Sequence, residues 1–242
     1  KQTAISCDKI VAVSENTAKD SLSCSKPKNK DIEITYLGAD DAFFDTPKAD
    51  SATREKYGIP TKYILYVGTL EPRKNVAGLI KGYRELPDSI KEEYKLVITG
   101  KKGWYYDEIF SITESDPKLK ENVIFTGFVD DEDMIPIMKG AAEVAYISFF
   151  EGFGLPVLEA MAAGVPIVTT AGSSLSEVAG DCGYLCDPNN HEDIALALKR
   201  ALNDSENKVD KALARARTFT WQRCGEHTLK AYEDAVKFRK GQ

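Results

Sequence analysis

The chain has 242 residues, of which 43% are hydrophobic and 29% charged, a soluble globular composition long enough for one large or two small domains. The formal net charge of -6 and the lack of a Lys/Arg run argue against nucleic-acid binding. No apolar run approaches the roughly 18 residues of a membrane span, and no signal-peptide segment occurs. The five cysteines form no C-x-x-C pair, so we interpret them as reduced thiols of a cytosolic protein.

Short apolar runs alternate with helical patterns along the whole chain, which predicts an α/β fold with a parallel sheet and helices on both faces. Ser14 and Asn75 are expected to cap the helices that follow them. The predicted strands are 9–14, 32–37, 63–67, 95–99, 123–126, 143–148, 165–170 and 184–186. The predicted helices are 15–24, 49–57, 76–86, 104–115, 130–139, 157–163, 175–179, 191–202, 206–217 and 220–240.

The stretch 146–170 carries two carboxylates in unusual places. Glu151 follows a buried strand in a Gly-rich turn, at the edge where open α/β sheets bind ligands. Glu159 lies about one turn into an otherwise apolar helix, where a carboxylate needs a partner. The N–H groups at the start of that helix, near Pro156, form an anion site. A nucleotide-sugar has the phosphate and the hydroxyl groups that would satisfy all of these.

The E-x7-E motif within EGFGLPVLEAMAAGVPIV resembles the signature of family 4 retaining glycosyltransferases, which have two facing Rossmann-like domains, the GT-B architecture. The resemblance implies that Glu151 contacts the transferred sugar and that Glu159 holds the ribose hydroxyls. The alternative is a helix N-terminal Glu followed by a solvated Glu on an ordinary helix. Two glycines, Pro156 and the flanking strands favour the functional interpretation.

The loop 68–75 is the second signal, because it also joins a buried strand to a helix. Its sequence VGTLEPRKN resembles the family's phosphate loop, often written GR-x4-5-K. Lys74 matches the Lys of that pattern, whereas Thr69 stands where many members carry the Arg. Arg73 is its expected replacement, since a guanidinium binds phosphate oxygens in a bidentate manner. A solvated pair of loop cations is the alternative.

The resemblance extends the donor site to the neighbouring strand ends, where the counterpart of 126–129 lines the base pocket. It implies catalytic roles for Glu151, Lys74 and Arg73. The implied substrate-binding residues are Glu159, Gly68, Thr69, Gly100, Lys101, Gly127, Phe128, Val129, Gly152, Phe153, Gly154, Leu155 and Pro156.

The resemblance to family 4 glycosyltransferases covers nearly the whole chain. It implies that the chain is the C-terminal half of a GT-B enzyme and consists of three parts. Residues 1–46 resemble a remnant of the N-terminal Rossmann-like domain and its connection. Residues 47–220 resemble the C-terminal donor-binding Rossmann-like domain, and 221–242 its crossover helix. The alternative is that the first residues form the first βαβ unit of a single domain.

The implied reaction moves a hexose from a nucleotide diphosphate sugar, GDP-mannose or UDP-hexose, to a glycan or lipid-linked acceptor with retention. The E-P-R-K-N sequence is similar to that of mannosyltransferases, which favours mannose. No metal or other cofactor is expected, because the acidic residues 131–133 fit a helix N-terminus better than a metal site. The expected setting is polysaccharide biosynthesis in the cytoplasm, with the full enzyme able to associate peripherally with the inner face of the membrane.

The main alternative is a nucleotide-sugar-binding module or subunit that is inactive without a separate acceptor domain or partner subunit. Another GT-B activity, such as a sugar-nucleotide epimerase, fits the E-x7-E and E-P-R-K-N sequences less well. Apolar residues on one face of the last helix, left exposed by a missing domain, also make self-association an expected property. These residues are Trp221, Leu229, Tyr232 and Val236.

Overall fold

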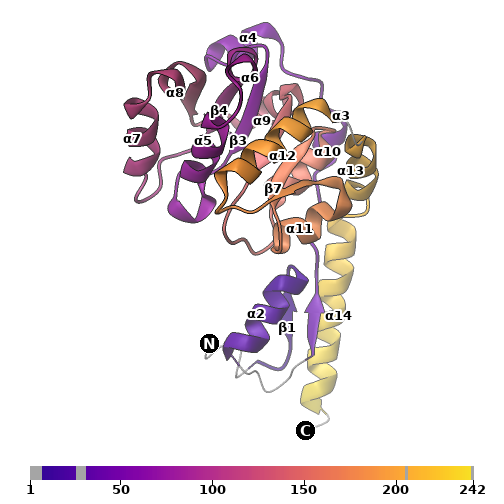
Figure 1. The fold of residues 1–242 in the computed structure, drawn as a ribbon. Helices are drawn as coiled ribbons and strands as arrows, with labels where there is room; N and C mark the ends of the chain where they lie inside the picture. Colours follow the sequence, from indigo (N-terminus) through magenta and orange to yellow (C-terminus); the bar gives the residue numbers. More distant parts are fainter. Residues whose placement is uncertain (1–6, 26–30, 205–206, 241–242) are drawn as a thin grey trace.

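The computed structural model describes residues 7–25, 31–204 and 207–240. It consists of a large α/β body and a small unit beside it, formed by the first and last segments of the chain (Figure 1). The candidate site lies on the large body, so the order of the strands there matters most.

A parallel six-stranded sheet runs through the large body, and it confirms the predicted fold class. Its strand order is β5-β4-β3-β6-β7-β8. The order therefore reverses between β3 and β6, and ligands of such sheets bind outside the carboxyl ends of the strands at this switch point. The strands are β3 Tyr63–Val67, β4 Lys95–Thr99, β5 Val123–Gly127, β6 Glu143–Tyr146, β7 Ile167–Thr170 and β8 Tyr184–Cys186.

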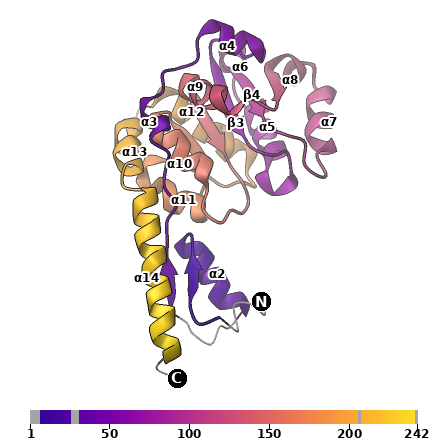
Figure 2. The same ribbon diagram turned by 180° about the vertical axis from the view of Figure 1, so that it is seen from behind.

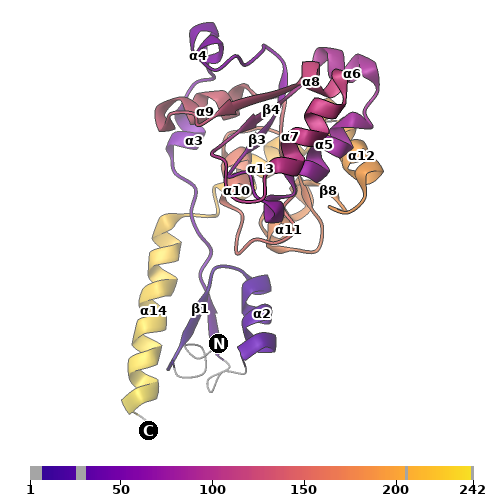
Figure 3. The ribbon, with the colours of Figure 1, turned by 90° about the vertical axis from the view of Figure 1, so that its left-hand side faces the viewer.

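Helices cover both faces of this sheet (Figures 2 and 3). On one face α5 packs against α7 and α12, and on the other α10 packs against α11 and α13. The helices of the large body are α3 Ala42–Asp45, α4 Ser51–Lys56, α5 Val76–Arg84, α6 Asp88–Glu93, α7 Asp107–Ser115, α8 Pro117–Asn122, α9 Asp131–Gly140, α10 Leu155–Ala162, α11 Ser174–Ala179, α12 His191–Asn203 and α13 Lys208–Ala216, with short 3-10 helices at Pro72–Lys74 (η1) and Gly180–Cys182 (η2).

The small unit combines the parallel strands β1 Ile10–Ala12 and β2 Ile32–Ile34 with helices α2 Glu15–Ser25 and α14 Trp221–Lys240. Helix α14 leaves the large body and runs back along β1 and β2 (Figures 1 and 3). The buried Glu33 on β2 holds this helix in place, because its carboxylate accepts from Lys230 Nζ at 3.0 Å and lies 2.8 Å from His227 Nδ1. The predicted division of the chain after residues 46 and 220 stays a prediction.

Ser14 caps α2 as predicted, because its hydroxyl accepts the backbone N–H of Thr17 at 3.0 Å. The predicted cap at Asn75 is wrong. Asn75 adopts the left-handed conformation with φ 54° and makes no side-chain cap. Its amide instead donates to the carbonyl of Pro188 at 2.9 Å, a contact that local sequence does not indicate.

Several predicted boundaries also differ from the structure. The helix expected over 104–115 begins at Asp107, because Tyr105 has φ 53° and lies in solvent. The strand expected over 143–148 ends at Tyr146. Helix α13 begins at Lys208, and residue 206 of the predicted helix lies outside the described residues. Helices α3, α6 and α8 were not predicted, since four to six residues are too few to show a helical period.

Candidate active site

The structure brings together three charged residues that the sequence places on two separate loops. Lys74 Nζ lies 2.6 Å from Glu151 Oε1, and Arg73 Nη1 lies 2.7 Å from Glu151 Oε2. Each carboxylate oxygen therefore has its own cation. The two loops follow β3 and β6, so this cluster lies at the switch point of the sheet.

Backbone geometry fixes the two loops against each other. Gly68 leaves β3 with φ 153°, and its N–H donates to the carbonyl of Thr99 at 3.0 Å. The chain then turns through η1, which places Arg73 and Lys74 at the edge of the sheet. The backbone N–H of Phe149 donates to the carbonyl of Arg73 at 2.9 Å and joins the loop after β6 to the loop after β3.

The charge of Glu151 is stabilised by this arrangement. Its side chain is only 11% exposed, and burial alone would raise its pKa. Hydrogen bonds from Lys74 and Arg73 outweigh burial, so the pKa of Glu151 lies below its ordinary value and the group is ionised at neutral pH. Glu71 completes the network, since this buried carboxylate accepts Arg73 Nη2 at 2.7 Å.

Two residues of this network, Glu71 and Tyr146, were not predicted. The Tyr146 hydroxyl lies 2.9 Å from Glu151 Oε1 and also contacts Lys74 Nζ. Glu71 is part of the E-P-R-K-N sequence, and Tyr146 ends a strand that also contains Glu143. The sequence shows the polar groups of both residues, although only the fold shows that they meet.

The residue before helix α10 is a glycine, Gly154, that no other residue can replace without strain. Gly154 has φ 106°, and a Cβ there would lie 2.3 Å from Leu175 Cδ2. No side chain caps α10, and Pro156 occupies its first turn as predicted. Pro156 has no N–H, and the N–H of Val157 donates to the carbonyl of Gly154 at 3.0 Å. In the first turn this leaves the N–H of Leu155 to face an anion.

The turn before α10 is held from two sides. The carbonyl of Glu151 accepts Ser174 Oγ at 2.8 Å. The carbonyl of Gly152 accepts the hydroxyls of Ser14 at 2.7 Å and Thr17 at 2.9 Å, both from the small unit. Segments far apart in sequence thus brace the turn, which sequence reasoning did not predict.

Glu159 lies in different surroundings from Glu151. It is half-buried within α10, and burial raises its pKa to about 6. Within residues 7–25, 31–204 and 207–240, no ion pair or side-chain hydrogen bond of Glu159 occurs. A half-buried carboxylate with open acceptor sites fits a ligand that supplies hydroxyl donors.

The other predicted residues divide into two groups. Gly68, Thr69, Gly100, Lys101, Gly127 and Phe128 end β3, β4 and β5 at the same edge of the sheet as Glu151. The ammonium of Lys101 lies 4.5 Å from the centre of the exposed Phe128 ring. In contrast, Val129 and Phe153 are each only 4% exposed, so neither presents its side chain to a ligand.

The acidic run at the start of α9 is engaged by other groups. Asp133 accepts Lys56 Nζ and the Tyr57 hydroxyl, both at 2.7 Å, and Asp130 accepts Lys56 Nζ at 2.9 Å. In the described part of the chain no three His, Cys, Asp or Glu residues are placed to hold a metal ion. Across the same residues, none of the helices has the length and apolar character needed to span a membrane.

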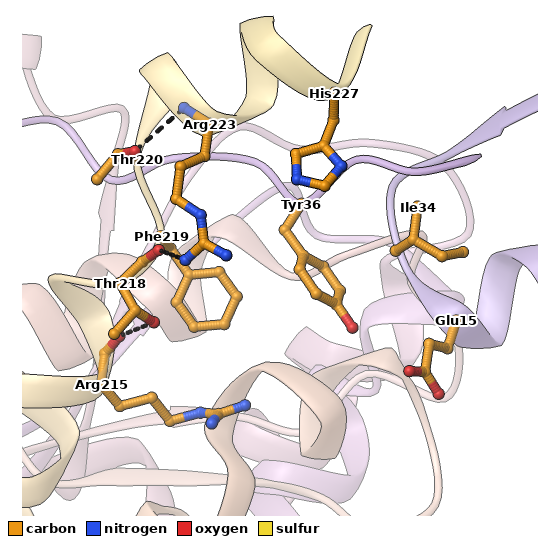
Figure 4. Close-up of a pocket in the computed structure, with 9 residues that line it drawn as sticks. All are labelled: Glu15, Ile34, Tyr36, Arg215, Thr218, Phe219, Thr220, Arg223 and His227. Carbon is orange, nitrogen blue, oxygen red and sulfur yellow. Dashed lines mark hydrogen bonds between the residues drawn. The ribbon is translucent and has the colours of Figure 1, made fainter. Parts of the chain in front are cut away.

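A separate cavity of about 380 Å³ lies where the small unit meets the α13–α14 junction. In Figure 4 the side chains of Arg215, Arg223 and His227 surround the rings of Tyr36 and Phe219. Arg215 donates to the carbonyls of Glu177 and Val178, and Arg223 to that of Thr218, each at 2.8 Å. The cavity contains no residue of the cluster around Glu151 and belongs to the joint between the two units.

Residues 50–218 match the family model of glycosyl transferases group 1, and the chain belongs to this family. It is therefore a family 4 protein with the Rossmann-like half of the GT-B fold. Over 174 residues it is 39% identical to O-antigen chain mannosyltransferase B of Escherichia coli. The aligned region covers 71% of this chain and 45% of that protein. The chain thus spans about half the length of this relative.

Two solved structures share the fold at low sequence identity. Sucrose-phosphate synthase from Thermosynechococcus elongatus superposes with a TM-score of 0.80 at 20% identity, over 98% of this chain and 60% of that one. The structure of Anabaena Alr3699/HepE in complex with UDP and glucose superposes with a TM-score of 0.74 at 19% identity. The superposition covers 95% of this chain and 63% of that one. These similarities establish the architecture and agree with the predicted GT-B half.

Proposed function

We propose that this chain is the donor-binding half of a hexosyltransferase that uses a nucleotide diphosphate sugar and retains the anomeric configuration. The observation that carries the proposal is the convergence of Lys74, Arg73 and Glu151 at the switch point of the sheet. About one turn into α10 lies Glu159, half-buried and without a side-chain partner among the described residues. Two cations, the N-terminus of α10 and this carboxylate fit the diphosphate and the ribose of one ligand.

Each residue then has a role that its surroundings support. Lys74, Arg73 and the N-terminus of α10 would stabilise the charge that develops on the leaving diphosphate. Glu151, ionised and held from several sides, would accept hydroxyls of the transferred sugar. Glu159 would accept the ribose hydroxyls, and the ends of β4 and β5 would line the base pocket.

Mannose is the favoured sugar and GDP-mannose the favoured donor, because of the similarity to O-antigen chain mannosyltransferase B and the E-P-R-K-N sequence. A UDP-hexose is the second candidate, since a structure with the same fold holds UDP and glucose. The acceptor would be a glycan or lipid-linked saccharide in polysaccharide biosynthesis. We place the reaction in the cytoplasm, with the whole enzyme at the inner face of the membrane.

A nucleotide-sugar-binding module that needs a separate acceptor domain or subunit is the alternative. The exposed apolar face of α14 favours it, because this face lies open beside the small unit. Its residues are Trp221, Leu229, Tyr232 and Val236, which are between 52% and 67% exposed. The same surface would support self-association of the chain.

Calorimetric titration of the chain with GDP, UDP and ADP, with and without EDTA, tests the proposal. We expect one nucleotide to bind equally with EDTA, and Lys74→Ala and Glu159→Ala to weaken it at least tenfold. Lys62→Ala is the control, because Lys62 pairs with Glu93 and precedes β3, at the opposite end of the sheet from Glu151. A folded wild-type chain that binds none of the three nucleotides would refute this donor site.

A further inference from the structure

Tyr146 is buried but connects the two charged loops of the candidate site. It ends β6, its side chain is 1% exposed, and its hydroxyl lies 2.9 Å from Glu151 Oε1. The ammonium of Lys74 contacts the same hydroxyl. An ammonium group can only donate, so the hydroxyl accepts from Lys74 and gives its single proton to Glu151. Both hydrogen-bonding capacities of this hydroxyl are therefore used inside the site.

The ring of Tyr146 is a rigid support for this hydroxyl. It stacks on Tyr66 of the neighbouring strand β3, with ring centres 6.0 Å apart and planes 14° apart. Lys74 Nζ also lies 5.1 Å from the centre of the Tyr146 ring. The hydroxyl thus projects from the sheet core, whereas the groups that it contacts come from loops.

Such a support matters when a donor binds. The cations that hold Glu151 in the free protein are the ones that the diphosphate would attract. If Lys74 and Arg73 turn toward the phosphate oxygens, the Glu151 carboxylate loses the two ion pairs that orient it. The hydroxyl of Tyr146 is uncharged and belongs to a ring fixed in the core, so it keeps its hydrogen bond to Glu151 when the diphosphate binds.

We propose that Tyr146 is a positioning residue, which keeps the Glu151 carboxylate toward the sugar and the Lys74 ammonium toward the diphosphate. This inference rests on the proposed function, because the ligand is the nucleotide-sugar donor. The tyrosine acts through Glu151 and Lys74 and has no contact of its own with the reacting atoms. Misplacement of such groups by small distances has large effects on binding and rate.

The test uses Tyr146→Phe, which keeps the ring and its stacking and removes only the hydroxyl. Tyr83→Phe is the matched control, because Tyr83 is equally buried and its hydroxyl bonds the carbonyl of Tyr94 at 2.8 Å, outside the site. Two quantities are measured on each chain: the pKa of Glu151 from its carboxyl carbon in an NMR titration, and the Kd for GDP-mannose and UDP-glucose.

We expect Tyr146→Phe to raise the pKa of Glu151 and to weaken donor binding on the order of tenfold, with both quantities unchanged in Tyr83→Phe. The other charged groups facing Glu151, Arg73 and Lys74, remain in both variants. A pKa and a donor affinity equal to those of the control would overturn the inference, as would a raised pKa with unchanged affinity. A wild-type chain that binds neither donor refutes the proposed function instead, and the pKa still decides whether Tyr146 holds Glu151.

Discussion

Replacing Glu159 by Gln is expected to stabilise the free protein while weakening its binding of a nucleotide. Glu159 is half-buried, and burial raises its pKa to about 6 from an ordinary value of 4.5. The folded protein therefore holds the proton more tightly than the unfolded chain does. With respect to this group, the free energy of unfolding is highest below about pH 4.5 and falls as the pH rises through about 6.

The size of the effect follows from the same pKa values. A tenfold change in proton affinity is about 1.4 kcal/mol, so the difference between 4.5 and about 6 corresponds to about 2 kcal/mol. Glutamine has nearly the same shape but cannot ionise. Glu159→Gln should therefore raise the free energy of unfolding by up to about 2 kcal/mol at pH 7.5, and by little at pH 4.5.

Urea unfolding of the two chains at pH 7.5 and pH 4.5, followed by circular dichroism, measures this difference. Glu55→Gln is the control, because Glu55 lies exposed on α4, where loss of its charge relieves no burial. If Glu159→Gln were no more stable at pH 7.5 than at pH 4.5, relative to wild type, the carboxylate would not carry an uncompensated charge. Glu159 would then lack the unsatisfied charge proposed to bind the ribose hydroxyls.

Three further predictions concern the surroundings of the site. Gly100→Ala should destabilise the protein by more than about 1 kcal/mol and lower its melting temperature, because φ is 138° and the new Cβ would lie 2.0 Å from the carbonyl oxygen of Gly68. An unchanged melting temperature would contradict this. Glu177→Gln should cost about 1 kcal/mol and speed amide exchange in the first turn of α2, since its carboxylate accepts the N–H of Glu15 at 2.7 Å and that of the next residue. Leu229→Asp on the exposed face of α14 should reduce self-association in sedimentation velocity, and an unaltered sedimentation profile would exclude this face from the contact.

Local sequence was enough to predict the strands and helices that shape the site. The turn before α10 was recognisable because Gly154 and Pro156 impose conformations that few other residues allow. The buried strands were recognisable because residues covered on both faces form continuous apolar runs. The family resemblance identified Glu151, Glu159 and Lys74 as candidates from the sequence alone.

Tertiary structure alone decided which of these groups meet. Arg73 and Glu151 are 78 residues apart in the chain, and their contact depends on β3 and β6 being neighbours in the sheet. The contact of Tyr146 with Glu151 and the hydrogen bond from Asn75 to the carbonyl of Pro188 likewise join residues far apart along the chain or on different elements. Sequence patterns report the period and polarity of single segments, whereas strand order and side-chain contacts result from how all the segments pack together.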